Sequence, residues 1–342
     1  MNEDIDREAR GYDRPRVQRT ASILRALIFV AFIALSAFWV IKWRMDKMAY
    51  RKWEIKMGSE MILLKGTNVK VFPPHTTYKM YTHNPQWGAY IARFNADGFR
   101  DKDYPREKPP NTARLLILGD SNTFGWGLDQ DDTFDNRLEI RLNKNSAGRR
   151  FEVINLSIPG INHCSESKIL RAIGITYRPD VVMVLADSDD FLPDNNQIFS
   201  GDLPELPSRL SRLADLKYLD AEKKRYMEII NNYQDKDSRY KSDIEVLLKE
   251  FVERPFQDMV SLRKAEGFRL IIFYFHRLPA WLEAQYTILT YRFDIPMIYL
   301  ETNNIPTSET AIPRDGHPTA SAIDNYADTA YKELSEMDLW KK

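Results

Sequence analysis

Five short apolar segments recur along the second two thirds of the chain. They are shorter than typical helices and mainly apolar, as are strands buried on both faces of a sheet. These segments cover residues 114–120, 151–156, 180–186, 269–275 and 296–300. Apolar residues at helical spacing follow in 133–145, 165–177 and 318–334. Strands that alternate with helices predict an α/β fold around a parallel sheet covered on both faces.

One much longer apolar run lies near the N-terminus. Residues 26–41 contain no charge, glycine or proline, and only Arg25 interrupts the run back to residue 21. Sixteen helical residues span about 24 Å, and Arg25 and Lys42 can extend their charged ends to the headgroup regions of a bilayer. The run lacks both a polar face and a small-residue cleavage site. These features favour an uncleaved transmembrane helix that covers residues 21–43 and contacts lipid. They argue against a core helix and against a signal peptide.

The orientation of this helix is not decided by charge, because basic residues flank both of its ends. A short tail ahead of a large domain suggests that residues 1–20 face the cytoplasm. We therefore expect a single-pass membrane protein whose main domain lies on the periplasmic or extracellular side.

Composition divides the chain further. A polar N-terminal tail (1–20) precedes the helix, a mixed juxtamembrane lead-in with scattered prolines (44–94) follows it, and the α/β pattern occupies 95–342. Within that domain, residues 204–260 are dense in charge and carry apolar positions at helical spacing. They predict a helical insertion, either a charged cap on the sheet or a hairpin that binds a protein partner.

Charge and cysteine content exclude several classes of protein. Among 342 residues, 49 Lys and Arg balance 49 Asp and Glu. Zero net charge without a long basic run argues against a nucleic-acid binder, and the apolar content argues against a disordered chain. The lone Cys164 excludes an intramolecular disulfide framework and a cysteine-based zinc site.

Polar turns follow the first three predicted strands, and one more precedes the last helix. Ligands of open parallel sheets bind beyond the carboxyl ends of the strands. The turns are residues 119–123 (GDSNT), 159–162 (PGIN), 187–190 (DSDD) and 315–318 (DGHP). Each alone is usual for a turn or a helix cap. Together they supply a hydroxyl nucleophile, an imidazole base, a carboxylate and backbone donors, as acyl transfer through a serine ester requires.

The wider blocks around these turns resemble the SGNH (GDSL) hydrolases. GDSNTFGWG (119–127), INLSIPGIN (154–162) and DGHP (315–318) are similar to three of that family's sequence blocks, and NADGFRD (95–101) to the lead-in of bacterial members. The resemblance covers about 95–334. It implies a flavodoxin-like three-layer α/β/α sandwich with a central five-stranded parallel sheet, and carboxyl-ester chemistry with no cofactor and no metal.

The resemblance also implies roles for single residues. Ser121 is the expected nucleophile, His317 its base, and Asp315 the carboxylate that orients His317. The expected donors to the oxyanion are the backbone N–H groups of Ser121 and Gly160.

One position departs from the family pattern. The family's third oxyanion donor is an asparagine side chain, and the aligned residue here is Asp189, followed by Asp190. An ionised carboxylate cannot donate a hydrogen bond. Three interpretations stay open: Asp189 is protonated, Asn162 or Asn122 substitutes for it, or the site is weakened.

Three further side chains have two interpretations each. His163 beside Cys164 could form a second nucleophile system, although no orienting partner is evident in the sequence. His276 either lines the site or caps a loop. Trp126 either walls the acyl pocket or packs in the core.

The sequence therefore predicts a membrane-anchored serine esterase or O-acyltransferase that acts on carboxyl esters. Acyl groups on envelope glycans are the expected substrate, by analogy with anchored bacterial members. The competing hypothesis is a non-catalytic SGNH-like scaffold subunit of a membrane complex, prompted by Asp189 and by segment 204–260. An ordinary α/β-hydrolase is excluded by motif, because Thr123 stands where that fold needs glycine.

Overall fold

The computed structural model of the chain describes residues 14–82, 84, 87–144, 146, 148–192, 244–302 and 305–337. The chain divides into two compact units, Met1–Gly58 and Ser59–Lys342. They are described separately below.

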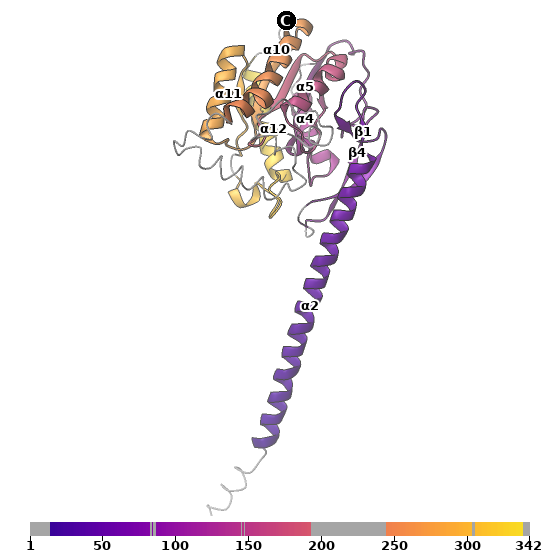
Figure 1. Cartoon of the computed structure of the whole chain (residues 1–342), viewed down its shortest axis with the longest axis vertical. Helices are drawn as coiled ribbons and strands as arrows, with labels where there is room; N and C mark the ends of the chain where they lie inside the picture. The colour runs from indigo at the N-terminus through magenta and orange to yellow at the C-terminus, as the bar shows by residue number, and fades with distance from the viewer. Residues whose placement is uncertain are drawn as a thin grey trace, which may run out of the picture. The chain divides into compact units, whose positions relative to one another are not determined.

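The N-terminal unit is built on one uninterrupted helix, α2 (Arg14–Glu60), whose course can be followed in Figure 1. Its stretch Ser22–Met45 has a mean hydropathy of 2.4, and none of its most apolar part is buried in the protein. Large apolar side chains lie in the open along it, Phe29 with 64% and Phe32 with 67% of its surface exposed. The stretch is long and apolar enough to cross a bilayer, and a signal sequence near the N-terminus would share these properties.

The C-terminal unit is organised around a five-stranded sheet in the order β6-β5-β7-β8-β9, with every pair parallel. This confirms the predicted α/β fold and its central parallel sheet. The strands are β5 (Thr112–Leu118), β6 (Arg150–Asn155), β7 (Val181–Leu185), β8 (Arg269–Tyr274) and β9 (Met297–Tyr299). All five residues of β7 are buried, as expected for a strand covered on both faces.

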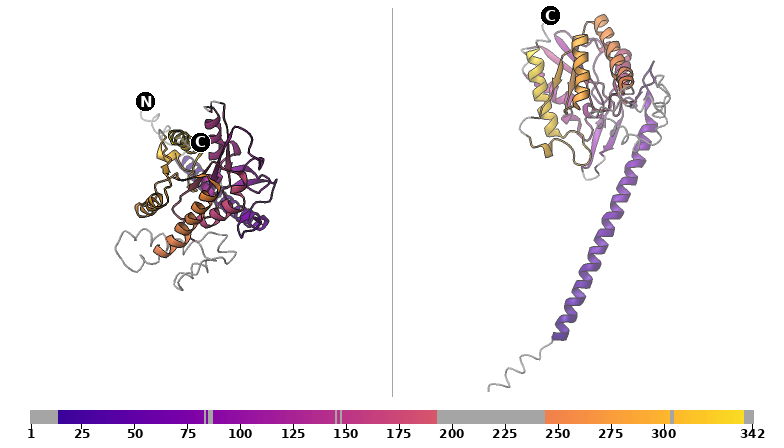
Figure 2. Two further views of the ribbon diagram at one scale, coloured as in Figure 1. Left: turned by 90° about the horizontal axis from the view of Figure 1, so that it is seen from above. Right: turned by 60° about the vertical axis from the view of Figure 1, so that its left-hand side comes forward.

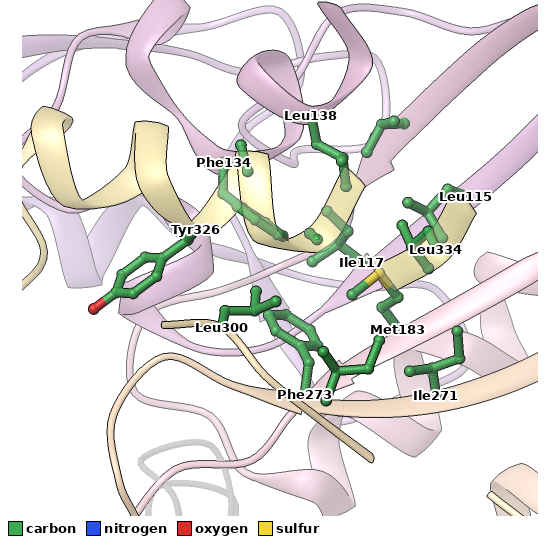
Figure 3. Close-up of a cluster of buried hydrophobic side chains, with 14 of the residues drawn as sticks. Leu115, Ile117, Phe134, Leu138, Met183, Ile271, Phe273, Leu300, Tyr326 and Leu334 are labelled. Carbon is green, nitrogen blue, oxygen red and sulfur yellow. The ribbon is translucent and has the colours of Figure 1, made fainter. Parts of the chain in front are cut away.

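Helices cover both faces of this sheet, as Figure 2 shows. On one face, α4 (Phe134–Lys144) and α12 (Ala320–Glu336) pack onto alternate strand residues. Figure 3 shows this cluster, in which the Phe134 ring of α4 stacks on the Phe273 ring of β8, with centroids 5.7 Å apart. The other face holds α5 (His163–Ala172), α10 (Arg254–Glu266) and α11 (Ala280–Phe293). Ring contacts join these three helices to one another.

The predicted helix over 165–177 is two elements in the structure. α5 ends at Ala172, and a short 3₁₀ turn, η2 (Gly174–Tyr177), follows it. A Cβ on Gly174 would lie 2.9 Å from Leu170 and 3.0 Å from Leu116. At Gly174 the backbone lies too close to the sheet to leave room for a side chain. The apolar residues continue at helical spacing through η2, which is why the sequence indicated a longer helix.

Two small antiparallel pairs precede the sheet, where the sequence indicated a lead-in. β1 (Ile62–Leu63) pairs with β2 (Lys70–Val71), and β3 (Thr77–Tyr81) pairs with β4 (Ala89–Arg93). The loop between β3 and β4 contacts the α/β body. Within it, the Asn84 amide donates to the Pro313 carbonyl at 2.9 Å, and the Trp87 indole N–H donates to the Gly127 carbonyl at 3.2 Å.

The predicted helical insertion (204–260) falls largely on residues 193–243, which lie outside the described residues. Its C-terminal part is helical, with a π-helical turn η3 (Lys249–Glu253) that leads into α10. Phe251 and Phe256 there are fully buried. This part therefore belongs to the helical layer on the sheet. A partner-binding role for the segment stays a prediction.

Candidate active site

The expected nucleophile lies at the carboxyl end of β5. A Cβ on Gly119 would meet the Thr123 hydroxyl oxygen at 2.3 Å and the Leu185 Cβ at 2.9 Å, so only glycine fits between β5 and β7. The Asp120 carboxylate then accepts from the Asn122 N–H at 2.8 Å and caps the short helix α3 (Ser121–Phe124). The strand end and the cap together place Ser121 at the first position of that helix.

The structure brings Ser121, His317 and Asp315 together, although the first two are 196 residues apart. His317 Nε2 lies 2.8 Å from Ser121 Oγ, and His317 Nδ1 lies 2.5 Å from Asp315 Oδ1. The Asp315 side chain is 0% exposed and that of His317 is 16% exposed. A carboxylate at Nδ1 favours the tautomer with its proton there, which leaves Nε2 to accept the serine proton.

A tight turn ahead of α12 holds this acid–base pair. The Ile312 N–H donates to the His317 carbonyl at 2.8 Å, and the Asp315 N–H donates to the Ile312 carbonyl at 3.1 Å. Gly316 between them has a φ of 92°, which residues with a side chain rarely adopt. The spacing of two residues between Asp315 and His317 thus results from a closed turn with glycine at its centre.

Trp126 forms a wall beside the imidazole. Its ring centroid lies 5.7 Å from that of His317, and only 7% of its surface is exposed. Both interpretations from the sequence therefore hold in part, because the ring is buried and also contacts the expected base.

A buried arginine fixes the loop that carries Trp126. Arg100, 1% exposed, donates to the carbonyls of Phe124 at 3.1 Å, Gly125 at 2.5 Å and Leu128 at 2.5 Å. Its guanidinium also lies over the Tyr90 ring, 5.1 Å from the centroid. Burial lowers the pKa of Arg100, and the facing carbonyls supply the acceptors that water would otherwise provide. The sequence block 95–101 contains Arg100, but its local pattern does not reveal that the guanidinium holds this loop.

The second expected turn follows β6. Gly160 is exposed there with a φ of 71°, in the left-handed region. Asn162 caps α5, accepting from the Cys164 N–H at 3.0 Å, and its amide donates to the Leu192 carbonyl at 2.7 Å. These bonds direct the Asn162 amide toward Leu192.

The third turn, after β7, brings carboxyl groups close to Asn122, the residue after Ser121. Burial raises the pKa of Asp120 well above its usual range, and the charges of Asp187 and Asp189 raise it further. Burial and Asp189 also raise the pKa of Asp187. The Asp187 carboxylate accepts from the Asn122 side-chain amide at 2.6 Å and from the Ser188 hydroxyl at 3.1 Å. The assignment of Asp189 to an oxyanion hole stays a prediction.

His163, the residue beside Cys164, has partners that were not predicted from the sequence. His163 is 0% exposed, with Nδ1 2.6 Å from Glu166 and Nε2 2.7 Å from the Tyr286 hydroxyl. The Cys164 thiol donates to the Glu250 carbonyl at 3.6 Å. The signal was present in the i, i+3 spacing of His163 and Glu166 on α5, but the histidine is buried too deeply to meet a substrate.

His276, directly after β8 and Phe275, lies near the expected triad. Burial lowers the pKa of His276, and the charge of His317 lowers it further. The charge of Asp187 acts in the opposite direction and raises this pKa. Its ring stands edge-on to Tyr326, with centroids 6.3 Å apart. Which of the two interpretations of His276 holds stays a prediction. Among the described residues, no group of three or more His, Cys, Asp or Glu side chains could hold a metal ion.

Comparison with known proteins gives structural matches only. No family model matches the chain. No curated protein matches it either. The psychrotrophic esterase EstA from Pseudoalteromonas sp. is 14% identical, covers 66% of this chain and 97% of its own, and has a TM-score of 0.42. A GDSL-like lipase from Bacteroides thetaiotaomicron is 12% identical, and the match covers 68% of this chain and 93% of the lipase, with a TM-score of 0.38. Axe2, an acetylxylan esterase from Geobacillus stearothermophilus, solved as a catalytic mutant, is 13% identical, covers 65% and 94%, and has a TM-score of 0.40.

Proposed function

We propose that this chain is a serine esterase or O-acyltransferase of the SGNH type, acting on carboxyl esters through Ser121, His317 and Asp315. One observation carries the proposal: a single imidazole lies 2.8 Å from a serine hydroxyl through one nitrogen and 2.5 Å from a buried carboxylate through the other. Such an arrangement activates a hydroxyl that is otherwise a weak nucleophile.

The chemistry follows from this geometry. Ser121 Oγ attacks the ester carbonyl while its proton passes to His317 Nε2, and the negative charge moves to the carbonyl oxygen. When the tetrahedral intermediate collapses, Nε2 returns the proton to the departing alkoxide, and the acyl group stays on Ser121. Water, or the hydroxyl of an acceptor, then removes the acyl group by the same steps. Asp315 holds the tautomer and stabilises the imidazolium, and the N–H groups of Ser121 and Gly160 face the oxyanion.

Hydrolysis of p-nitrophenyl acetate by the full chain in detergent tests this function. Ser121→Ala should reduce kcat at least about 10³-fold, because no other described group takes its place as nucleophile. A fluorophosphonate probe should label the wild type at Ser121. The control is Ser261→Ala, on the exposed face of α10, where the hydroxyl donates to the Gln257 carbonyl at 2.8 Å. Equal rates for the wild type and Ser121→Ala would refute serine catalysis.

We further propose that residues 21–43 anchor the enzyme in a membrane, with its catalytic unit on the periplasmic or extracellular side and acyl groups on envelope glycans as substrate. The exposed apolar stretch Ser22–Met45 supports the anchor. Protease added to intact spheroplasts should digest the C-terminal unit. Complete protection of that unit would place it in the cytoplasm and remove envelope glycans as substrate.

A non-catalytic scaffold is the second candidate. The acidic turn at Asp187 and Asp189 favours it, since carboxylates beside Ser121 oppose a developing oxyanion. A scaffold should co-purify in a stoichiometric membrane complex and resist the probe. Rapid labelling at Ser121 would exclude it.

A further inference from the structure

A buried polar network surrounds His163 on α5. His163 Nδ1 is 2.6 Å from Glu166 Oε2, and His163 Nε2 is 2.7 Å from Tyr286 Oη and 3.2 Å from Asp190 Oδ2. None of these four residues is more than 3% exposed. They come from α5, α11 and the turn after β7, so the network joins three elements at one point.

This network is costly to bury, which makes a structural role alone a poor explanation. Phe256 packs on the His163 ring, with centroids 4.9 Å apart. Burial lowers the pKa of His163 and raises that of Asp190, so the surroundings disfavour both charges. Apolar side chains that replace such buried groups often stabilise a protein. Since apolar residues could make this core more stable, the presence of the polar network indicates a role in the proposed active site.

The network connects to Asn122, the residue after the nucleophile, through two short hydrogen bonds. Asp190 Oδ2 accepts from the Asp187 backbone N–H at 2.6 Å, which closes the turn after β7. The Asp187 carboxylate in turn accepts from the Asn122 side-chain amide at 2.6 Å. Asn122 follows Ser121 directly in α3. An unbroken series of contacts therefore runs from Tyr286 to the residue beside the nucleophile.

The two N–H groups of the Asn122 side-chain amide are held unequally. One hydrogen is held by Asp187 at 2.6 Å, whereas the remaining contact, to Asp120 Oδ2, is 3.4 Å long. A hydrogen bond of that length is weak, and a developing oxyanion is a stronger acceptor. A primary amide here also supplies the donor that a carboxylate at Asp189 lacks.

We propose that Asn122 is the third oxyanion donor of this site, and that His163 and Asp190 are positioning residues that hold it in place through Asp187. The inference rests on the proposed function and adds to it a donor outside the family pattern. Asn122 touches the reacting oxygen in this scheme, whereas His163 acts only through the turn that Asp190 closes.

A double-mutant cycle on the detergent-solubilised full chain tests the proposal, with kcat and KM for p-nitrophenyl acetate measured per folded molecule. Asn122→Ala should lower kcat about 10²-fold and leave KM within about threefold, because an oxyanion donor acts mainly in the transition state. His163→Gln should lower kcat about tenfold. Combining them should cost no more than Asn122→Ala alone, because His163 has no other route to the reaction.

Glu152→Gln serves as the matched control. Glu152 and Arg114 form an equally buried pair, 2.8 Å apart and at most 1% exposed, near the amino ends of β6 and β5, whereas Ser121 follows the carboxyl end of β5. Its loss should lower thermal stability but leave kcat per folded molecule unchanged. If His163→Gln is too unstable to assay, Tyr286→Phe completes the cycle, since it removes one hydroxyl only.

Three outcomes are decisive. An Asn122→Ala variant with wild-type kcat overturns the donor assignment while serine catalysis stands. Fully additive losses in the double variant overturn the positioning role of His163. A wild type that neither hydrolyses the ester nor reacts with the probe overturns the proposed function, and this inference with it.

Discussion

At the scale of single residues, the proposed chemistry depends on which nitrogen of His317 carries the proton. Asp315, fully buried and 2.5 Å from Nδ1, selects that tautomer. Asp315→Asn can present its amide N–H to Nδ1 instead, which turns the Nε2 lone pair into an N–H. We expect kcat for p-nitrophenyl acetate to fall about 10³–10⁴-fold, with KM and thermal stability little changed. The control is Asp258→Asn, on an exposed part of α10. A variant that keeps more than a tenth of wild-type kcat would show that Asp315 does not orient the base.

At the scale of elements, a buried carboxylate joins β6 to α4. Asp135 Oδ1 accepts from the Asn155 side-chain amide at 2.8 Å, and the Asn155 backbone N–H donates to Asp101 at 2.8 Å. Burial raises the pKa of Asp135 to about 6. The folded state therefore binds this proton more tightly than the unfolded chain, and the stability it contributes is complete below about pH 4 and lost as pH rises through 6.

Asp135→Asn keeps an acceptor for Asn155 and removes the ionisation. Two pKa units correspond to roughly 3 kcal/mol. As the pH rises from 4 to 7.5, the wild type should lose up to that much free energy of unfolding that the variant keeps. Urea unfolding at both pH values measures it. Asp324→Asn, on the exposed side of α12, should show no comparable pH-dependent gain. A constant difference between Asp135→Asn and the wild type would contradict the shifted pKa.

Elements also show what a local pattern can predict. The five strands were predictable because burial on both faces leaves an apolar run that few other structures produce. α11 was not predicted, since its buried Leu282 and Leu289 alternate with the exposed Ile288 and Tyr291 and blur the helical stripe. The three residues of the proposed triad were named from the polar turns and from the resemblance of those turns to the SGNH sequence blocks. Contacts such as those of Arg100 depend on residues distant in sequence, and no local spacing encodes them.

At the scale of the whole molecule, the division at Gly58 and Ser59 makes a prediction about membrane attachment. The described strands, α3 and the proposed triad belong to the unit Ser59–Lys342, whereas the exposed apolar stretch Ser22–Met45 belongs to the other unit. A chain of residues 59–342 should therefore fold without detergent. Its melting temperature should match that of the full chain within about 2 °C, and its kcat should be unchanged.

The matched experiment keeps the chain whole and alters only the apolar stretch. Phe32→Arg with Leu35→Arg places two charges near its centre, each of which costs about 2.5–3.5 kcal/mol on insertion. After carbonate extraction, the wild type should stay with the membranes, whereas the double variant and residues 59–342 should be released. Retention of the 59–342 chain would mean that its own surface binds the membrane. Release of the wild type with a shortened N-terminus would instead identify the stretch as a cleaved signal sequence, because an anchor must remain attached to the unit it holds.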